Sequence, residues 1–209
     1  AELHHAEEYA CEHPLHNGHL RQINYVKSSC KYDYIAVFLS GNFTQRGESA
    51  VLDKYTRAKA AIASGADLVL ELPYPWSSAS AEYFARAAVS VLSGFCDTLL
   101  FGSECGDIDL ICRAATLASS EEFREEYRRR TKAGEGAAGV YFDMLREAGA
   151  PLGSNDLLGV EYVRAIGELS ADMFISIHSN APGANAPNYS EIRGSEVFYS
   201  ITDPEVNAD

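Results

Sequence analysis

His16 and His19 lie three residues apart in "HPLHNGHL" (13–20), directly before a stretch with helical spacing. Imidazole N–H groups donate hydrogen bonds to phosphate oxygens, and the N-terminus of a helix favours the same anion. Gly18 allows a nucleotide to approach the backbone closely. His16 and His19 therefore suit stabilisation of charge on an α-phosphate during displacement of pyrophosphate. The structural alternative is that His16 caps the helix and His19 faces solvent.

The composition is that of a globular chain with a large excess of acid. The 209 residues are 46% hydrophobic and carry a net charge of −13. This length suits one domain or a domain with an appendage, and no apolar run approaches the ~20 residues needed to span a bilayer. The acidic, histidine-rich first residues are not the pattern expected of a signal or transit peptide. We expect a cytoplasmic protein without a membrane partner; its charge argues against binding nucleic acid by overall attraction but leaves a local basic groove open.

Five cysteines are present, and none forms a CxxC pair. An odd number without paired spacing argues against a disulfide framework or a structural zinc site. We expect reduced thiols and assign no residue as a metal ligand. The cysteines are Cys11, Cys30, Cys96, Cys105 and Cys112.

Apolar runs of strand length alternate with helical patterns, which predicts an α/β fold with a parallel sheet and crossover helices. One helix is expected to begin at an Asp53 cap and end at Gly65, and another to end at Gly94. Ligands of such sheets bind beyond the carboxyl ends of the strands. The expected strands are 32–40, 66–73, 97–104 and 173–178, and the expected helices are 18–29, 53–65, 77–94 and 155–169.

The stretch before the histidines is the weakest strand candidate. "AEEYACE" (6–12) contains two adjacent glutamates where a central strand is expected to be apolar. Two interpretations are open: the stretch is an edge strand, or the true N-terminal strand is missing or altered.

Several blocks resemble one family. "PLHNGHL" matches the H-x-G-H signature of the nucleotidyltransferase-like superfamily, which includes class I aminoacyl-tRNA synthetases. More narrowly, the sequence resembles the bacterial tRNA(Met) cytidine acetate ligases over about residues 10 to 166. The resemblance implies a Rossmann-like domain that activates acetate with ATP to acetyl-adenylate and passes the acetyl group to the wobble cytidine of elongator tRNA(Met). The blocks are "SGNFTQRGESAVLDKYTRAKAAIASGADLVLELP", "ASAEYFARAAVSVL", "FGSECGDI" and "SNDLLGVEYVRAI".

The resemblance implies an ATP site that includes the whole signature, namely His16, Asn17, Gly18 and His19. It also assigns ATP contacts to Gly102 and Asn155. A side chain at Gly102, at the carboxyl end of a strand, would obstruct an adenosine, and the Asn155 amide suits adenine or ribose. Without the family resemblance, each residue has a structural alternative. Gly102 is then an ordinary turn glycine, and Asn155 is a helix N-cap.

Further cations are candidates for the phosphates. Arg46 lies in a loop expected at the carboxyl edge of the sheet. Its planar guanidinium can donate two hydrogen bonds to a phosphate, to acetate or to a tRNA phosphate, and we predict a catalytic role for it. Arg57 is either functional or half of a surface ion pair with Asp53. "YSEIRG" (189–194) echoes the second superfamily signature, which would place two more triphosphate contacts at Ser190 and Arg193.

The resemblance implies a basic, glycine-containing segment after the fourth strand. The segment found there, "IHSNAPGANAPN" (177–188), contains no Arg or Lys, and His178 is the candidate substitute for the cation. Residues 119–150 are expected to form a helical insertion in a nucleotidyltransferase-like domain of residues 1–180, followed by a loop-rich tail, 181–209. "EEYRRRTK" (125–132) is typical of a solvated helix face, with a basic tRNA patch as the alternative.

These observations favour an ATP-dependent ligase with acetate and tRNA(Met) as partners and ATP, accompanied by Mg²⁺, as cosubstrate. Acetate is already ionised near neutral pH, so positioning and charge neutralisation suffice without a general base. Two alternatives remain: an adenylyltransferase acting on a phosphate monoester, which suits the acidic chain better, and a catalytically silent nucleotide- or partner-binding module.

Overall fold

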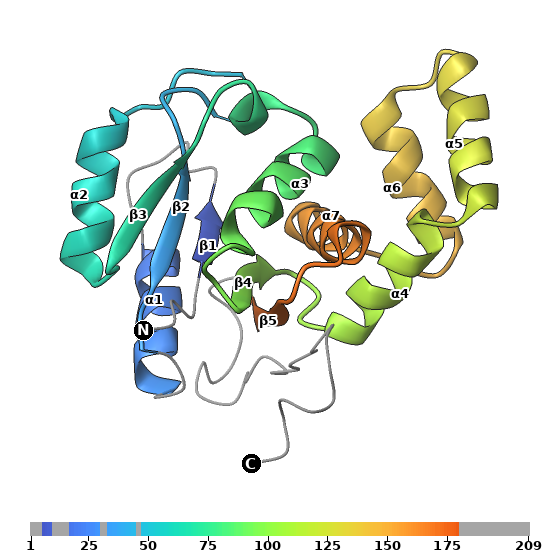
Figure 1. Cartoon of the computed structure of the whole chain (residues 1–209). Coiled ribbons are helices and arrows are strands. Elements are labelled where there is room, and N and C mark those ends of the chain that lie inside the picture. Colours follow the sequence, from blue (N-terminus) through green and yellow to red (C-terminus); the bar gives the residue numbers. More distant parts are fainter. Residues whose placement is uncertain (1–5, 10–16, 30–32, 45–46, 180–209) are drawn as a thin grey trace, which may run out of the picture.

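A computed structural model describes residues 6–9, 17–29, 33–44 and 47–179, with helices on both faces of a parallel sheet (Figure 1). In chain order its elements are β1 (Ala6–Tyr9), α1 (Asn17–Ser29), β2 (Ala36–Ser40), α2 (Lys54–Ser64), β3 (Leu68–Leu72), the 3-10 turn η1 (Trp76–Ser78), α3 (Ala81–Leu92), β4 (Thr98–Ser103), α4 (Ile108–Ala118), α5 (Glu121–Lys132), α6 (Ala137–Glu147), α7 (Ser154–Leu169) and β5 (Phe174–Ser179).

The described strands form one sheet in the order β3-β2-β1-β4-β5, with every pair parallel. The predicted α/β class is thus confirmed, but the interpretation of the first strand as an edge strand is wrong. β1 lies in the middle, where Ala6–Tyr9 pair with Ala36–Leu39 on one side and Ala6 and Glu7 pair with Leu99 and Leu100 on the other. Backbone hydrogen bonds hold a strand of any sequence, so the two glutamates do not exclude it from the centre.

Each face of the sheet has its own core. Successive side chains of a strand point to opposite faces, and accordingly Phe38 belongs to a large core with α3, α4 and α7, whereas Val37 and Leu39 belong to a smaller one with α1 and α2. The larger core also includes Tyr162, whose ring lies 5.6 Å from that of Phe101. Packing in these two cores fixes the positions of the helices whose ends lie at the carboxyl edge of the sheet.

Helix α2 begins and ends as predicted. The Asp53 side chain accepts hydrogen bonds from the first backbone N–H groups, and Gly65 adopts a left-handed conformation with φ 111°. The expected glycine end of α3 is wrong. That helix ends at Leu92 with Ser93 as its cap, in a right-handed conformation that does not require glycine.

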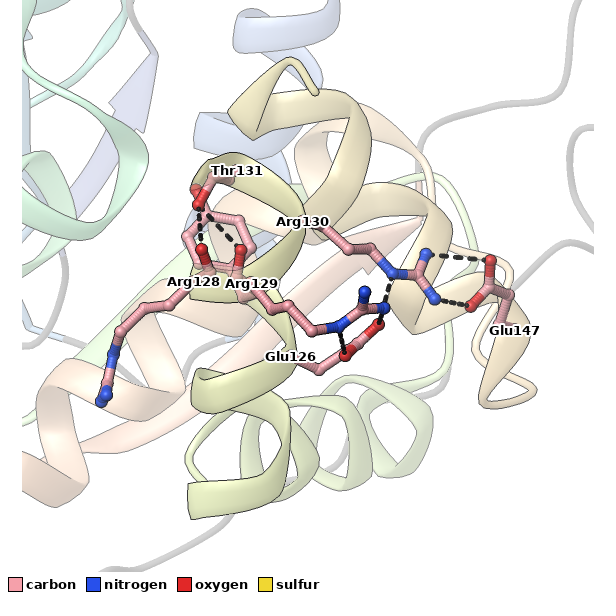
Figure 2. A network of polar contacts seen from close by, with 7 residues as sticks. Glu126, Arg128, Arg129, Arg130, Thr131 and Glu147 are labelled. Atoms are coloured by element: carbon pink, nitrogen blue, oxygen red, sulfur yellow. Dashed lines mark hydrogen bonds and ion pairs between the residues drawn. The ribbon is translucent and has the colours of Figure 1, made fainter. Parts of the chain in front are cut away.

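Helices α5 and α6 form a hairpin beside α4 and α7 (Figure 1). Phe123 of α5 and Val140 of α6 are buried in the large core. The charges of α5 lie outside: Glu126 accepts hydrogen bonds from Arg129 and Arg130, and these bonds lower the pKa of Glu126 to about 2 (Figure 2). The solvated face expected for this segment is present.

Two glycines of α7 allow a matched test of how tightly this helix packs. A Cβ at Gly159 would overlap the buried ring of Phe101, whereas nothing lies near one at Gly167. We expect Gly167→Ala to stabilise the fold by about 0.5–1 kcal/mol through helix propensity. Gly159→Ala should instead destabilise it by about 1–3 kcal/mol through overpacking. Urea unfolding followed by circular dichroism measures both, and equal effects would contradict the close packing of α7.

Within the described part of the chain, the helices are too short or too polar to span a bilayer.

Candidate functional site

The strand order reverses between β1 and β4, and these two parallel strands end at the same carboxyl edge of the sheet. Ligands of open α/β sheets bind at such a point. Helix α1 begins at Asn17 after β1, and β4 ends at Ser103, so the predicted signature and the predicted "FGSE" segment both follow strands at this edge. The topology therefore brings together two blocks more than eighty residues apart in the sequence.

The histidine signature is described only in part. Asn17 and Gly18 are the first two residues of α1, and His19 follows in the same turn with only 4% of its surface exposed. The alternative that His19 faces solvent is wrong, because the helix is packed at this position. Four predicted site residues lie outside the described residues: His16, Arg46, Ser190 and Arg193.

Gly102 is buried in β4, where it pairs in register with His178 of β5. It is the second-last residue of its strand, so it lies inside the sheet and the alternative of a turn glycine is wrong. The loop that follows, from Glu104 to Asp107, leads into α4 at the edge where the ligand is expected.

Asp156 holds this loop in place. It is completely buried in the first turn of α7, and its carboxylate accepts hydrogen bonds from Ser103 Oγ at 2.6 Å and from the backbone N–H groups of Glu104 at 2.9 Å and Cys105 at 3.2 Å. It also accepts one from the Gly153 N–H at 2.8 Å. A buried carboxylate with this many donors is well compensated for its loss of water.

Glu104 makes the reverse contact. Its carboxylate accepts hydrogen bonds from the backbone N–H groups of Asn155 at 3.0 Å and Asp156 at 3.2 Å, at the positive end of α7. We call these two reciprocal contacts the Glu104–Asp156 clasp. The interpretation of Asn155 as an N-cap is wrong, because Gly153 occupies that position. The clasp brings Asn155 next to the loop that begins two residues after Gly102.

The sequence reasoning missed both residues of the clasp. Both acids are close in the sequence to residues predicted to contact ATP. Glu104 lies two residues after Gly102, and Asp156 directly follows Asn155. Only Asn155 was predicted to act at this helix start, whereas Asp156 both completes the capping box of α7 and accepts hydrogen bonds from a loop fifty residues away.

The loop after β2 is held by Arg57. This side chain is 2% exposed and donates hydrogen bonds to the carbonyl oxygens of Ser40 at 3.0 Å, Leu52 at 3.1 Å and Gly41. The expected surface ion pair between Asp53 and Arg57 is therefore wrong. Asp53 instead caps α2, and hydrogen bonds from Thr56 lower the pKa of Asp53.

Lys54 is also engaged at this edge. Its Nζ lies 2.6 Å from the Glu71 carboxylate at the end of β3, and this hydrogen bond raises the pKa of Lys54.

Among the residues that the structure describes, no three His, Cys, Asp or Glu side chains come together as a metal-binding group.

The comparisons with known proteins show the family of this chain. The family model for HIGH Nucleotidyl Transferase matches residues 8–181. The chain belongs to this family. It is 39% identical over 160 residues to the tRNA(Met) cytidine acetate ligase of Anoxybacillus flavithermus, covering 73% of this chain and 40% of that protein. It is 46% identical over 119 residues to the ligase of the same name from Clostridium tetani, covering 55% of this chain and 30% of that protein.

A solved structure has the same fold. The crystal structure of Thermotoga maritima TmcAL bound with alpha-thio ATP matches with a TM-score of 0.74 and 33% identity, covering 88% of this chain and 48% of that one. The resemblance to tRNA(Met) cytidine acetate ligases and the Rossmann-like nucleotidyltransferase fold are thereby confirmed. The chain spans about two fifths of the length of the curated relatives it matches.

Proposed function

We propose that this chain carries the ATP-dependent acetate-activating site of a tRNA(Met) cytidine acetate ligase. The observation that supports this most directly is the Glu104–Asp156 clasp, which brings Asn155 next to the loop after Gly102 at the edge where α1 begins. The ligases named among the relatives and the alpha-thio ATP bound to the Thermotoga protein support the same reaction.

In the proposed mechanism, the acetate carboxylate attacks the α-phosphate in line and pyrophosphate leaves. His16 and His19 donate hydrogen bonds to the phosphate oxygens as negative charge develops, and the positive end of α1 adds to this. Arg46, Ser190 and Arg193 contact the phosphates, while Asn17, Gly18, Gly102 and Asn155 bind the rest of ATP. The acetyl group then passes to the wobble cytidine of tRNA(Met), and AMP is released.

Mg²⁺ accompanies the triphosphate in this proposal, because it prefers phosphate oxygens and water to an all-protein cage. The reaction belongs in the cytoplasm. We further propose that residues 1–180 form the nucleotidyltransferase-like domain, with 119–150 as a helical insertion and 181–209 as a tail.

The test is acetate-dependent exchange of pyrophosphate into ATP. The wild-type chain should catalyse exchange, and His16→Ala and His19→Ala should each lower its rate about 100-fold, as expected for loss of one transition-state donor. Lys59→Ala, an exposed change on α2, is the control and should leave the rate unchanged. Because His19 is buried, its variant must first show wild-type circular dichroism. Unchanged exchange in folded histidine variants would refute the mechanism.

The net charge of −13 favours a second candidate, an adenylyltransferase that acts on a phosphate monoester. In the same assay, exchange that responds to phosphate monoesters and not to acetate would select this function. Absence of ATP binding by calorimetry would instead select a catalytically silent binding module.

A further inference from the structure

Three buried polar side-chain atoms at the carboxyl end of β2 have no hydrogen-bond partner among the described residues. They are Oγ of Ser40, the last residue of the strand, Oγ1 of Thr44 in the loop that follows, and Nη1 of Arg57, which reaches this end from α2. Each of these residues has at most 2% of its surface exposed. Buried polar groups without partners are rare because they are costly, and they point to a bound polar ligand or water. We call Ser40, Thr44 and Arg57 the β2 cluster.

Arg57 brings a buried positive charge to this strand end. Its Nε donates to the carbonyl oxygen of Leu52 at 3.1 Å, and its Nη2 donates to the carbonyl oxygens of Ser40 at 3.0 Å and Gly41. All of these described partners are neutral. A buried charge is stable when it is paired with an opposite charge as well as hydrogen-bonded. An anion bound at Nη1 would supply the missing counter-charge.

The described acids near this strand end do not supply that charge. Glu71 lies against Gly41, but its carboxylate is paired with Lys54 Nζ at 2.6 Å. Asp53 accepts hydrogen bonds from the first N–H groups of α2, where it serves as the cap. Glu48 has an exposed side chain. The charge of Arg57 therefore remains available to a ligand.

The loop after β2 is already fixed in position around Thr44. The Thr44 N–H donates to the Glu48 carbonyl oxygen at 2.9 Å, and the Thr44 carbonyl oxygen accepts hydrogen bonds from the Gly47 N–H at 2.9 Å and from Ser78 Oγ at 3.1 Å. The backbone of Thr44 is thus fully bonded, whereas its buried hydroxyl is not. Donors that are held in place before a ligand arrives lose little freedom when they bind it.

The β2 cluster lies beside the strand that leads to the proposed α-phosphate site. β2 pairs in parallel with β1, and Leu39, directly before Ser40, is in register with Tyr9 at the end of β1 (Figure 1). Helix α1 follows β1 and begins at Asn17 with the histidine signature. An anion at the end of β2 is therefore a neighbour of the segment that is proposed to bind the phosphates.

The donors of the β2 cluster fit a carboxylate. Two hydroxyl groups and one guanidinium nitrogen can donate to carboxylate oxygens, and the charge of Arg57 balances that of one carboxylate. A triphosphate carries more negative charge than one buried cation balances. Leu72, in register with Ser40, is completely buried and gives the strand end an apolar neighbour that suits a methyl group.

We propose that the β2 cluster is the acetate-binding site of this chain, where Ser40 Oγ, Thr44 Oγ1 and Arg57 Nη1 donate hydrogen bonds to the acetate carboxylate. The identity of the ligand rests on the proposed function, because acetate is the nucleophile of that reaction. A carboxylate has lone pairs enough to accept these bonds and still direct one oxygen at the α-phosphate. The cluster would thereby position the nucleophile, separately from the residues proposed to bind ATP.

The first test is thermal unfolding in sodium acetate against sodium chloride of equal ionic strength. It is run with and without α,β-methylene ATP, which cannot release pyrophosphate. Increasing acetate should raise the Tm of the wild type by about 2–5 °C. Ser40→Ala and Thr44→Val should lose this response. In chloride alone both variants should unfold at or slightly above the wild-type Tm, because each change removes a buried hydroxyl that has no described partner.

The second test is the KM for acetate in pyrophosphate exchange. Ser40→Ala and Thr44→Val should each raise it about tenfold or more, as expected for loss of a hydrogen bond to a charged group, and should leave the KM for ATP within about twofold of the wild type. Thr116→Val is the matched control. It removes an exposed hydroxyl of α4 that donates to the Cys112 carbonyl oxygen at 3.0 Å, and it should keep wild-type behaviour in both tests.

A response to acetate that is lost in both cluster variants and kept in the control would support the site. It would do so even if the wild type showed no exchange, a result that would refute the proposed function alone. A wild-type KM for acetate in the two variants, or a KM for ATP that rises as much as that for acetate, would overturn the site. So would a wild-type Tm that does not respond to acetate, or a marked loss of stability of both variants in chloride.

Discussion

Replacement of Asp156 by alanine is expected to lower the free energy of unfolding by about 3 kcal/mol, because Ser103, two loop N–H groups and the Gly153 N–H all lose their buried acceptor. Under conditions where the variant stays folded, its affinity for ATP should fall at least about tenfold, since the loop after Gly102 is no longer held. Urea unfolding measures the first effect and calorimetry with ATP the second.

Two further variants isolate the role of the clasp. Asp156→Asn keeps the shape and one acceptor oxygen, so it should fall between alanine and the wild type in both measurements. Asp143→Asn removes an acid that is 48% exposed and accepts a hydrogen bond from Arg146 at the surface, so it should change stability by less than about 0.5 kcal/mol. Wild-type affinity for ATP in folded Asp156→Ala would show that the clasp does not position the nucleotide.

The second large effect is expected from Arg57→Met, which keeps much of the side-chain volume but removes the donors to three carbonyl groups. The free energy of unfolding should fall by about 2–4 kcal/mol, since these oxygens stay buried without their partner. The loop between β2 and α2, which carries Arg46, should become more sensitive to proteolysis. Thermal unfolding and limited trypsin digestion measure these changes.

Lys59→Met is the matched control, because it removes a cation from an exposed position two residues further along α2. It should leave both unfolding and digestion of the loop unchanged. Arg57→Lys retains the charge but offers a single nitrogen, so it should recover only part of the stability. An Arg57→Met variant as stable as the Lys59→Met control would mean that the loop is held by other contacts.

The fold was predictable wherever the sequence pattern and the burial agree. Val37, Phe38 and Leu39 are buried on both faces of a parallel sheet, so their continuous apolar run predicted a strand, and Asp53 and Gly65 mark the ends of α2. β1 was misplaced because the position of a parallel strand is set by its neighbours in space, and its own residues carry little of that information.

The site was predictable only in its local parts. The histidine signature and the glycine of "FGSE" can be found by inspection, because each prediction rests on the residues of a single segment. The clasp joins Glu104 to Asn155 and Asp156 across the fold, and Arg57 reaches carbonyl groups at the end of another element. Hydrogen bonds between distant segments leave no spacing to recognise in a sequence.

The central place of β1 also orders the assembly of this domain. Ala6 and Glu7 find one neighbour once Ala36 has been synthesised, but their other neighbour, Leu99, emerges from the ribosome more than sixty residues later. Until then an open edge is exposed to other nascent chains, a state in which aggregation competes with folding. The amides that bond across this last junction should gain protection from hydrogen exchange only when the second half of the sheet arrives.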